Sequence, residues 1–371
     1  MNTSLPLDGL TIVEFGQYIA VPAATQLLAD QGATVIKVEQ PGGEAARNAG
    51  AYGEAIIQAY NRGKKMVEID LRSSEGLDHA RRLVRGADAV ISNFKPGVLA
   101  KYGLGAAALT ATDPRLVVIE FSGFGDSDRP GLDIAAQAES GIMWITGEAD
   151  SEPQRVGFPL VDAAAGYLMS QLLTSALFKQ LRTGEGSRID LSLWDVAIHM
   201  QAAIWTDFER TGHEPARKGN GQPKAAPAAD VYRVRDGYVV ISAYIDAHWR
   251  RLCVALGMED LLEDARFADE SKRAEHRPLL TERLETGLGK LSKDEAVAKL
   301  GTAGVVCGGI REYPEVLAAR GISSSGPFIP ATGGPRWLVG GPYQWAGVLP
   351  HQEAPRPAGA DNERLLGVAA V

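Results

Sequence analysis

The stretch "LTIVEFGQYIAVPAATQLLADQGATVIKVE" (residues 10–39) contains the pattern that predicts the fold. Two short apolar runs, residues 10–14 and 34–39, have the length and composition of buried strands. Between them, Pro22 near a helix start and Gly32 after the last apolar residues predict a helix that ends at Gly32. Strand, helix and strand in this order indicate a βαβ unit, which joins two parallel strands.

The same alternation continues along the chain. The runs "MVEIDL" (66–71), "DAVISNF" (88–94) and "PRLVVIEFSGFG" (114–125) predict three more strands, with a helical pattern between the first two. A helix is expected from about Ile134 to Ile145, and residues 187–205 begin as a strand and continue as a helix. Short loops between alternating strands and helices predict an α/β fold with a parallel, doubly wound sheet.

The length of 371 residues predicts a large domain and a smaller one. After Trp205 the composition changes to a segment rich in Gly, Pro, Ala and Lys, and a strand–turn–strand hairpin around Asp236 follows it. A charged helical pattern then runs from about 247 to 322. The expected organisation is a large domain over 1–210, a linker with a glycine loop over 211–230, a small domain over 231–326, and a segment over 327–371 that returns to the large domain.

Composition excludes several classes of function. The net charge of −8 gives no overall attraction to nucleic acid or to an anionic membrane, so an anionic ligand needs a local cluster of cations and N–H groups. Cys253 and Cys307 have no cysteine neighbours, which excludes a disulfide framework and a zinc knuckle and predicts a reducing, cytoplasmic location. The N-terminus lacks signal-peptide features, no apolar run could span a bilayer, and the six histidines lack metal-site spacing.

Asp162 is the first candidate for chemistry. It stands at the start of a helical run over residues 155–181 whose next charged residue is Lys179. Two interpretations are open: Asp162 caps the helix, or it is a nucleophile toward an activated acyl group. A helix N-terminus would hold its carboxylate ionised in either case. Gly166, one turn later, permits close approach of a ligand or of another backbone.

Three further groups are candidates, each with a structural alternative. Asp133 and Gln137 are spaced i, i+4, which places them on one face of a helix. They could be site residues, or they could belong to an ordinary capped helix with a polar exposed face. Gly219 and Gly221 could bind an anion, move as a lid or form a flexible linker. Cations in strand-end loops could converge on phosphates or be simply solvated; they are Lys37, Arg47, Arg62, Lys64, Lys65, Lys95 and Lys101. A G-x-G-x-x-G motif, typical of nicotinamide binding, does not follow the first strand.

An ordered set of motifs from about residue 5 to 260 resembles one family. The set includes "LPLDGLTIVEFG", "YNRGKKMVEIDL", "ISNFKPGVLAKYGL", "PLVDAAAGYL" and "RTGEGSRIDLSLWDVAI". Together they resemble the class III coenzyme A transferases, which include formyl-CoA and carnitine CoA-transferases and the α-methylacyl-CoA racemases. The resemblance implies a Rossmann-like large domain, a small domain, and a homodimer of interlocked chains.

The resemblance also implies roles for particular residues. Asp162 matches the catalytic aspartate, and Asp133 and Gln137 match polar positions on a neighbouring helix. Gly219, Gly221 and Gln222 resemble a mobile glycine loop. The implied substrates are an acyl-CoA and a small carboxylic acid, with neither a tightly bound cofactor nor a metal. Segments that line the CoA cleft contain Lys37, Arg47, Asn61, Arg62, Lys64, Asn93, Phe94 and Lys101.

The racemase branch differs from this chain at one informative position. It carries a catalytic histidine where this chain has Leu132, and leucine cannot transfer a proton. Asp246 lies near a supporting glutamate of that branch. The resemblance, with leucine at this position, therefore implies CoA transfer through an aspartyl anhydride and an aspartyl-CoA thioester on Asp162. The alternatives are an acyl-CoA racemase or isomerase, and an acyl-CoA-binding protein without activity.

Overall fold

The computed structural model describes residues 5–125, 127, 129–221, 228–343, 345 and 350–368. Its contacts divide the chain into two compact units. The first consists of Met1–Ile142, Arg155–Ala202 and Ala319–Val371, and the second of Met143–Gln154 and Ala203–Ala318. The domain boundaries expected from sequence stay a prediction; nothing in the sequence pattern had grouped Met143–Gln154 with the second unit.

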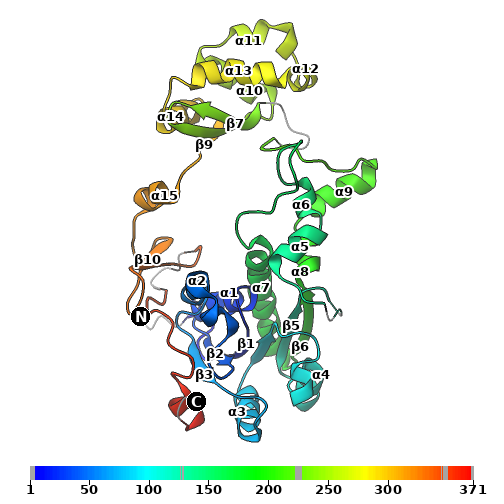
Figure 1. Cartoon of the computed structure of the whole chain (residues 1–371), viewed down its shortest axis with the longest axis vertical. Coiled ribbons are helices and arrows are strands. Elements are labelled where there is room, and N and C mark those ends of the chain that lie inside the picture. Colours follow the sequence, from blue (N-terminus) through cyan, green and yellow to red (C-terminus); the bar gives the residue numbers. More distant parts are fainter. Residues whose placement is uncertain are drawn as a thin grey trace. The chain divides into compact units, whose positions relative to one another are not determined.

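The first unit is built on a six-stranded parallel sheet with the strand order β3-β2-β1-β4-β5-β6 (Figure 1). This confirms the predicted α/β class and parallel sheet. Because β1 has β2 on one side and β4 on the other, the strand order reverses beside β1. The strands are β1 (Thr11–Phe15), β2 (Thr34–Glu39), β3 (Lys65–Glu68), β4 (Ala89–Ser92), β5 (Val117–Ser122) and β6 (Ser187–Ser192).

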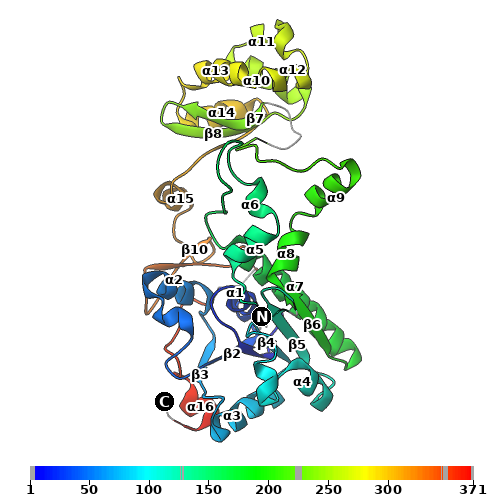
Figure 2. The same cartoon turned by 45° about the vertical axis from the view of Figure 1, so that its right-hand side comes forward.

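Both faces of this sheet are buried, which explains the continuous apolar runs. Successive side chains of a strand point to opposite faces, so Ile12 and Val35 belong to one core, and Val13 and Ile36 to the other. Two long helices that lie side by side, α1 (Ala20–Ala29) and α7 (Leu160–Thr183), cover the first face (Figure 2). The second face is covered by α3 (Ser74–Arg85), α4 (Ala106–Thr112) and the C-terminal α16 (Asn362–Leu366).

The helix predicted from Ile134 to Ile145 is two helices, so that prediction is wrong in its length. It breaks at Gly141, whose φ of +90° no helix can continue. Residues 187–205 likewise contain a strand followed by parts of two helices, where a single helix was expected. The two helices in the first segment are α5 (Asp133–Glu139) and α6 (Ile142–Ile145), and the two in the second are α8 (Leu193–His199) and α9 (Ala202–Thr211). The helices that follow β2 and β4 are η1 (Ala45–Asn48), α2 (Gly50–Tyr60) and η2 (Leu99–Tyr102).

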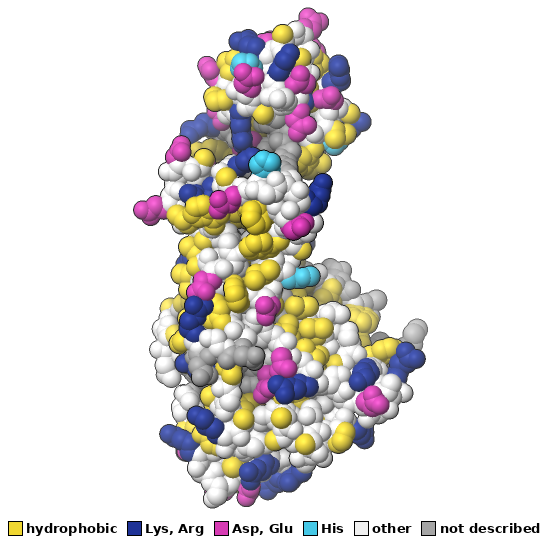
Figure 3. Space-filling view, turned by 90° about the vertical axis from the view of Figure 1, so that its right-hand side faces the viewer, with side chains coloured by type: hydrophobic (Ala, Val, Ile, Leu, Met, Phe, Trp, Pro, Cys, Tyr) yellow, Lys and Arg dark blue, Asp and Glu magenta, His cyan; other side chains and the backbone are white. Residues whose placement is uncertain are grey.

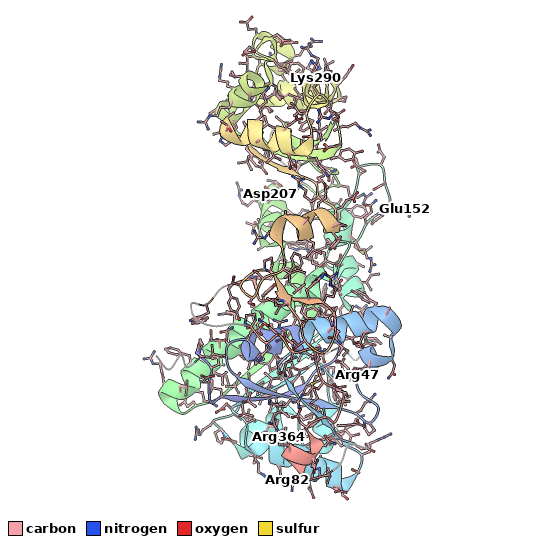
Figure 4. All side chains as sticks on the ribbon, turned by 90° about the vertical axis from the view of Figure 1, so that its left-hand side faces the viewer. Arg47, Arg82, Glu152, Asp207, Lys290 and Arg364 are labelled. Atoms are coloured by element: carbon pink, nitrogen blue, oxygen red, sulfur yellow. The ribbon has the colours of Figure 1, made fainter. Side chains whose placement is uncertain are left out.

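The C-terminal segment binds the exposed edge of strand β3. The Asp361 N–H donates to the Met66 carbonyl (2.9 Å), and the Glu68 N–H donates to Asn362 Oδ1 (2.8 Å). These bonds satisfy edge groups that would otherwise be open to another chain. Figure 4 labels Arg82 and Arg364 near α16. A short hairpin precedes this segment, formed by β10 (Phe328–Pro330) and β11 (Trp337–Val339).

The second unit has a three-stranded antiparallel sheet, in the order β7-β8-β9. The hairpin predicted around Asp236 is confirmed, since Val234 pairs with Gly237. No helix in the described ranges is long and apolar enough to span a membrane. The elements are β7 (Ala229–Val234), β8 (Gly237–Ser242), α10 (Asp246–Leu256), α11 (Asp260–Glu263), η3 (Ala265–Phe267), α12 (Glu270–Glu275), α13 (Arg277–Leu288), α14 (Lys293–Thr302), β9 (Val306–Gly309) and α15 (Tyr313–Arg320).

A buried ionic network joins β1 and β2, near their carboxyl ends, to Lys64, which directly precedes β3. Glu14 on β1 accepts from Lys37 on β2 (2.9 Å) and from Lys64 (2.8 Å), and all three side chains are fully enclosed. Glu44 pairs with the other side of Lys37 (2.9 Å). Burial alone would raise the pKa of Glu14, but the two ammonium groups outweigh it and lower this pKa to about 2. Glu14 is therefore the shared anion of the network.

Glu14→Gln should lower the free energy of unfolding by about 3–5 kcal/mol, because it leaves two buried ammonium groups facing one remaining carboxylate. Urea unfolding of both proteins would measure the difference. Asp78→Asn is the control, since Asp78 pairs with Arg81 at the surface and should change stability by no more than about 0.5 kcal/mol. Equal stability of Glu14→Gln and the parent protein would contradict the role of the network.

Candidate active site

Asp162 is the third residue of α7, within its first turn. Pro159 occupies the N-cap position and provides no side-chain bond, and the structure shows no capping bond from Asp162. The interpretation of Asp162 as the helix N-cap is therefore wrong. Its side chain is partly exposed at the carboxyl edge of the sheet, where ligands bind in open α/β folds.

The carboxylate of Asp133 caps α7 instead. Its Oδ1 atom accepts from the backbone N–H groups of Val161 (2.7 Å) and Asp162 (3.2 Å). Its Oδ2 atom accepts from Gln137 Nε2 (2.5 Å), and Gln137 Oε1 accepts from the Val156 N–H (2.9 Å). The predicted shared helix face of Asp133 and Gln137 is confirmed. These bonds hold Asp133 against the backbone of the candidate nucleophile.

This arrangement raises the pKa of Asp162 to about 7, from an ordinary value of 3.8. Burial is the larger cause and the negative charge of Asp133 the second. Burial and Asp133 therefore act against the ionisation that a helix terminus favours, and the nearest N–H groups, those of Val161 and Asp162, donate to Asp133. Asp162 is an acid that changes its charge near neutral pH, as acid–base catalysts and tuned nucleophiles do.

Gly166 serves helix packing. A Cβ atom there would lie 2.9 Å from the Cβ of Ala23 and 3.3 Å from the Ala20 carbonyl oxygen, so glycine lets α7 approach α1. Both helices run antiparallel to the strands of one parallel sheet, so both begin at its carboxyl edge. Asp162, one turn before Gly166, therefore lies level with the start of α1 at Ile19.

A pocket of about 440 Å³ opens at the same edge, beyond the ends of β1 to β4. Phe94 was predicted to line the CoA cleft, and it lines this pocket. No sequence motif pointed to the other lining residues. Several of them directly follow strands, and this position is the signal that could have identified them. The lining consists of Phe15, Val38, Glu39, Gln40, Pro41, Ile69, Asp70, Leu71, Arg72, Phe94, Val98 and Tyr102.

Four predicted CoA contacts are buried and bound to other protein groups. Lys37 and Lys64 belong to the ionic network, and burial together with Lys37 lowers the pKa of Lys64 to about 8. Arg62 pairs with Asp30 and donates to the Val339 carbonyl (3.0 Å). Asn61 donates to a carbonyl of α2 and accepts from Lys64. A phosphate could reach these four side chains only by displacing their partners, so we do not propose them as direct contacts.

The remaining predicted CoA contacts differ in how far their polar groups are exposed or already bonded to other protein groups. Lys101, on η2, is exposed. Arg47, labelled in Figure 4, is 18% exposed and pairs with Glu39 (2.6 Å). Asn93 has both polar atoms bonded to the backbone of Gln17. Lys101 and Arg47 are therefore the predicted cations that a phosphate could still reach.

The glycine loop lies in the second unit, where Gly219 and Gly221 each lie beside a charged side chain. Gly219 has a φ of +58°, and its N–H donates to the Gly147 carbonyl (2.9 Å). A Cβ atom on Gly219 would meet Glu148, and one on Gly221 would meet Arg277. Gln222 lies outside the described residues. A Cβ atom at either position would require the flexible end of the neighbouring side chain to move, and at Gly219 the positive φ also disfavours a side chain.

Leu132 and Asp246, which bear on the racemase alternative, are both on the surface. Leu132 precedes α5 and is 63% exposed beside the capping residue Asp133. Asp246 begins α10 and pairs with buried Arg273 (2.8 Å). Among the residues that the structure describes, no cluster of side chains suits a metal ion.

A model of CoA-transferase family III matches residues 7–362. The chain belongs to this family. It is 36% identical to the succinate–glutarate CoA-transferase of Agrobacterium fabrum over 340 residues, 88% of this chain and 85% of that protein. It is also 36% identical to Rv3272 of Mycobacterium tuberculosis, named a probable fatty acyl-CoA transferase, over 82% of each chain.

Solved structures agree with this assignment over nearly the whole chain. A CAIB/BAIF family protein from Brucella suis superposes with a TM-score of 0.87 and 35% identity, covering 98% of this chain and 99% of that one. The Rv3272 structure superposes with a TM-score of 0.85 and 31% identity. The chain is thus a class III CoA-transferase, for which CoA thioesters are substrates.

For this CoA-transferase, Asp162→Asn should abolish part of the pH dependence of stability. Native Asp162 has a pKa of about 7 and the unfolded residue about 4, so the native state keeps a proton that the unfolded state has released. The free energy of unfolding of the parent protein therefore falls as pH rises from about 4 to 7. Asparagine cannot ionise, so the variant should be more stable at pH 8 by about 2 kcal/mol and similar at pH 4.

Urea unfolding at a series of pH values measures this difference. Asp150→Asn, at an exposed aspartate, is the control and should keep the pH profile of the parent protein. Parallel profiles for Asp162→Asn and the parent protein would show that Asp162 has an ordinary pKa.

Proposed function

We propose that this CoA-transferase moves CoA from an acyl-CoA to a carboxylic acid through covalent intermediates on Asp162. The observation that carries the proposal is the position of Asp162. Its carboxylate lies at the carboxyl edge of the sheet, its backbone is fixed by Asp133, and its pKa is close to neutral. A carboxylate with a raised pKa is a stronger nucleophile once ionised, and it is available at neutral pH.

The proposed reaction has four steps. Ionised Asp162 attacks the thioester carbonyl and expels CoA thiolate, which leaves a mixed anhydride. The thiolate attacks the Asp162 carbonyl and expels the donor acid, which leaves an aspartyl-CoA thioester. The acceptor carboxylate attacks this thioester and expels the thiolate, forming a second anhydride. The thiolate then attacks the acceptor carbonyl, which yields the new acyl-CoA and free Asp162, with no net change in protons or electrons.

Binding of CoA retains the thiolate between these steps. We propose that the strand-end pocket holds the nucleotide part of CoA, with the rings of Phe94 and Tyr102 beside the adenine. Exposed cations near this edge, Arg72 and Lys101, would face the phosphates.

Hydroxylamine or borohydride should trap Asp162 once an acyl-CoA is added, because both reagents attack activated acyl groups. Peptide mass spectrometry would locate the modification. Asp162→Ala should abolish transfer and trapping while circular dichroism stays unchanged, and Asp150→Ala should retain both. Transfer by Asp162→Ala would overturn the covalent mechanism, and acyl-CoA binding without exchange against a panel of acids would favour a binding protein.

Racemisation is the second candidate function, because a pKa near 7 also suits proton transfer. Such an enzyme would exchange the α-proton of an acyl-CoA in deuterated water without any acceptor acid. We expect no such exchange, since Leu132 offers no second proton carrier beside Asp133. A panel of acids that includes succinate, glutarate and fatty acids would identify the substrates, as relatives are named for each of these.

We also propose that the enzyme is a homodimer of interlocked chains in the cytoplasm. The helices α9 and α15 contain no buried residue, yet they expose Trp205, Phe208 and Tyr313. Figure 3 shows hydrophobic side chains exposed on one face of the chain. Such apolar surface is typical of an interface between subunits. The two cysteines are free thiols, in keeping with a reducing compartment.

Light scattering after size exclusion should give a mass of twice 39.5 kDa. Trp205→Asp should shift this mass toward that of one chain at low concentration, because a charge would be buried in the interface. Asp207→Asn, on the same helix, is the control for a change of charge alone. A parent protein with the mass of one chain at all concentrations would exclude the dimer.

A further inference from the structure

The turn between β1 and α1, Gly16 to Ile19, has an unusual backbone. Tyr18 has a φ of +59°, and it is the one non-glycine residue with a positive φ in the described part of the chain. A bulky residue adopts this left-handed conformation only where its surroundings hold it, and such residues cluster at functional sites. The turn follows β1, where the strand order of the sheet reverses and ligands bind in folds of this type.

The side-chain amide of Asn93 holds the turn from the β4 side. Asn93 Oδ1 accepts from the Gln17 N–H (2.9 Å), and Asn93 Nδ2 donates to the Gln17 carbonyl (2.9 Å). Asn93 directly follows β4, so this pair of bonds joins the loops on either side of the reversal point. These bonds use one donor hydrogen of Nδ2 and one lone pair of Oδ1, and together they fix the orientation of the amide toward the turn.

The buried ionic network holds the turn from the β2 side. Glu44 Oε2 accepts from the Tyr18 N–H (2.7 Å), and Lys37 Nζ donates to the Gly16 carbonyl (2.7 Å). Lys37 and Glu44 also pair with each other (2.9 Å). Three consecutive residues of the turn are thus bonded through their backbone to side chains from three different segments.

The turn borders the candidate nucleophile. Ile19, its last residue, lies level with Asp162 because α1 and α7 meet at Gly166 and begin at the same edge of the sheet. Phe15, directly before the turn, lines the strand-end pocket. The turn therefore lies between the pocket proposed for the nucleotide and the carboxylate proposed to attack the thioester.

We propose that Asn93 and Glu44 are positioning residues, which hold the turn Gly16–Ile19 in its left-handed form so that the thioester meets Asp162. This inference rests on the proposed function and replaces the expectation that Asn93 binds CoA directly. A displaced turn would misplace the reacting groups and slow acylation while leaving the nucleotide pocket intact.

The test compares Asn93→Ala with Gln180→Ala. Gln180 is a buried amide that donates to the carbonyls of Asp88 (3.1 Å) and Arg115 (2.6 Å), so it joins two loops at the opposite, amino edge of the sheet. Both variants should lose some thermal stability. Only Asn93→Ala should slow single-turnover acylation of Asp162, by about tenfold or more, with the Kd of free CoA nearly unchanged in calorimetry.

A double-mutant cycle with Tyr18→Gly tests the conformational cause. Glycine adopts a φ of +59° without strain, so Asn93→Ala should cost less in the Tyr18→Gly background than in the parent protein. Glu44→Gln, which keeps a carbonyl acceptor for the Tyr18 N–H, should slow acylation less than Glu44→Ala.

Three outcomes would overturn the inference. They are a Kd of CoA that rises in Asn93→Ala as much as acylation slows, an equal loss of acylation in Gln180→Ala, and unchanged acylation in Asn93→Ala. If the parent protein forms no acyl-Asp162 at all, the proposed function itself fails, and this result is distinct from the other three.

Discussion

The carboxyl edge of the sheet depends on Glu14, a buried anion shared by two lysines. Glu14 lies on β1, Lys37 on β2 and Lys64 just before β3, so one carboxylate connects three neighbouring strands. Through Lys37 the same network reaches Glu44 and the turn after β1. Buried charges are costly unless each is paired, so these side chains allow few alternative arrangements. The network thereby holds the turn after β1 in a fixed position.

A second carboxylate pair gives the candidate site its chemistry. Asp133 accepts three hydrogen bonds, two of them from the first turn of α7, and these bonds fix its carboxylate against the backbone of that helix. Asp162, close by on the same turn, has no comparable donors and takes up a proton more readily. The carboxylate that caps α7 therefore adds to the effect of burial, which is the larger cause of the raised pKa of Asp162.

The fold was largely predictable, because each strand of the parallel sheet is an apolar run and each connection is short. The errors fell where local geometry overrides periodicity. Gly141 interrupts a helix that the apolar spacing alone would continue. The strand-end pocket was not predicted, because lining residues such as Gln40 and Leu71 have no side-chain group that marks a binding site in sequence. Their importance comes from following strands that end at one edge, and this requires the strand order.

The predicted CoA-binding cations show why the position of a residue in a family motif does not establish its role. Lys37 and Lys64 stand in segments that resemble a CoA cleft, yet their ammonium groups are saturated by Glu14 and by backbone carbonyls. A sequence reports that a lysine is present at a strand end but not which anion it faces. Asn93 is the same case among neutral residues, because its amide is bonded to the Gln17 backbone on both sides. A motif can therefore persist for the shape of a binding loop as well as for contact with the ligand. A residue that shapes the loop and a residue that contacts the ligand differ in which of their polar atoms are already bonded within the protein. Only the folded structure shows this difference.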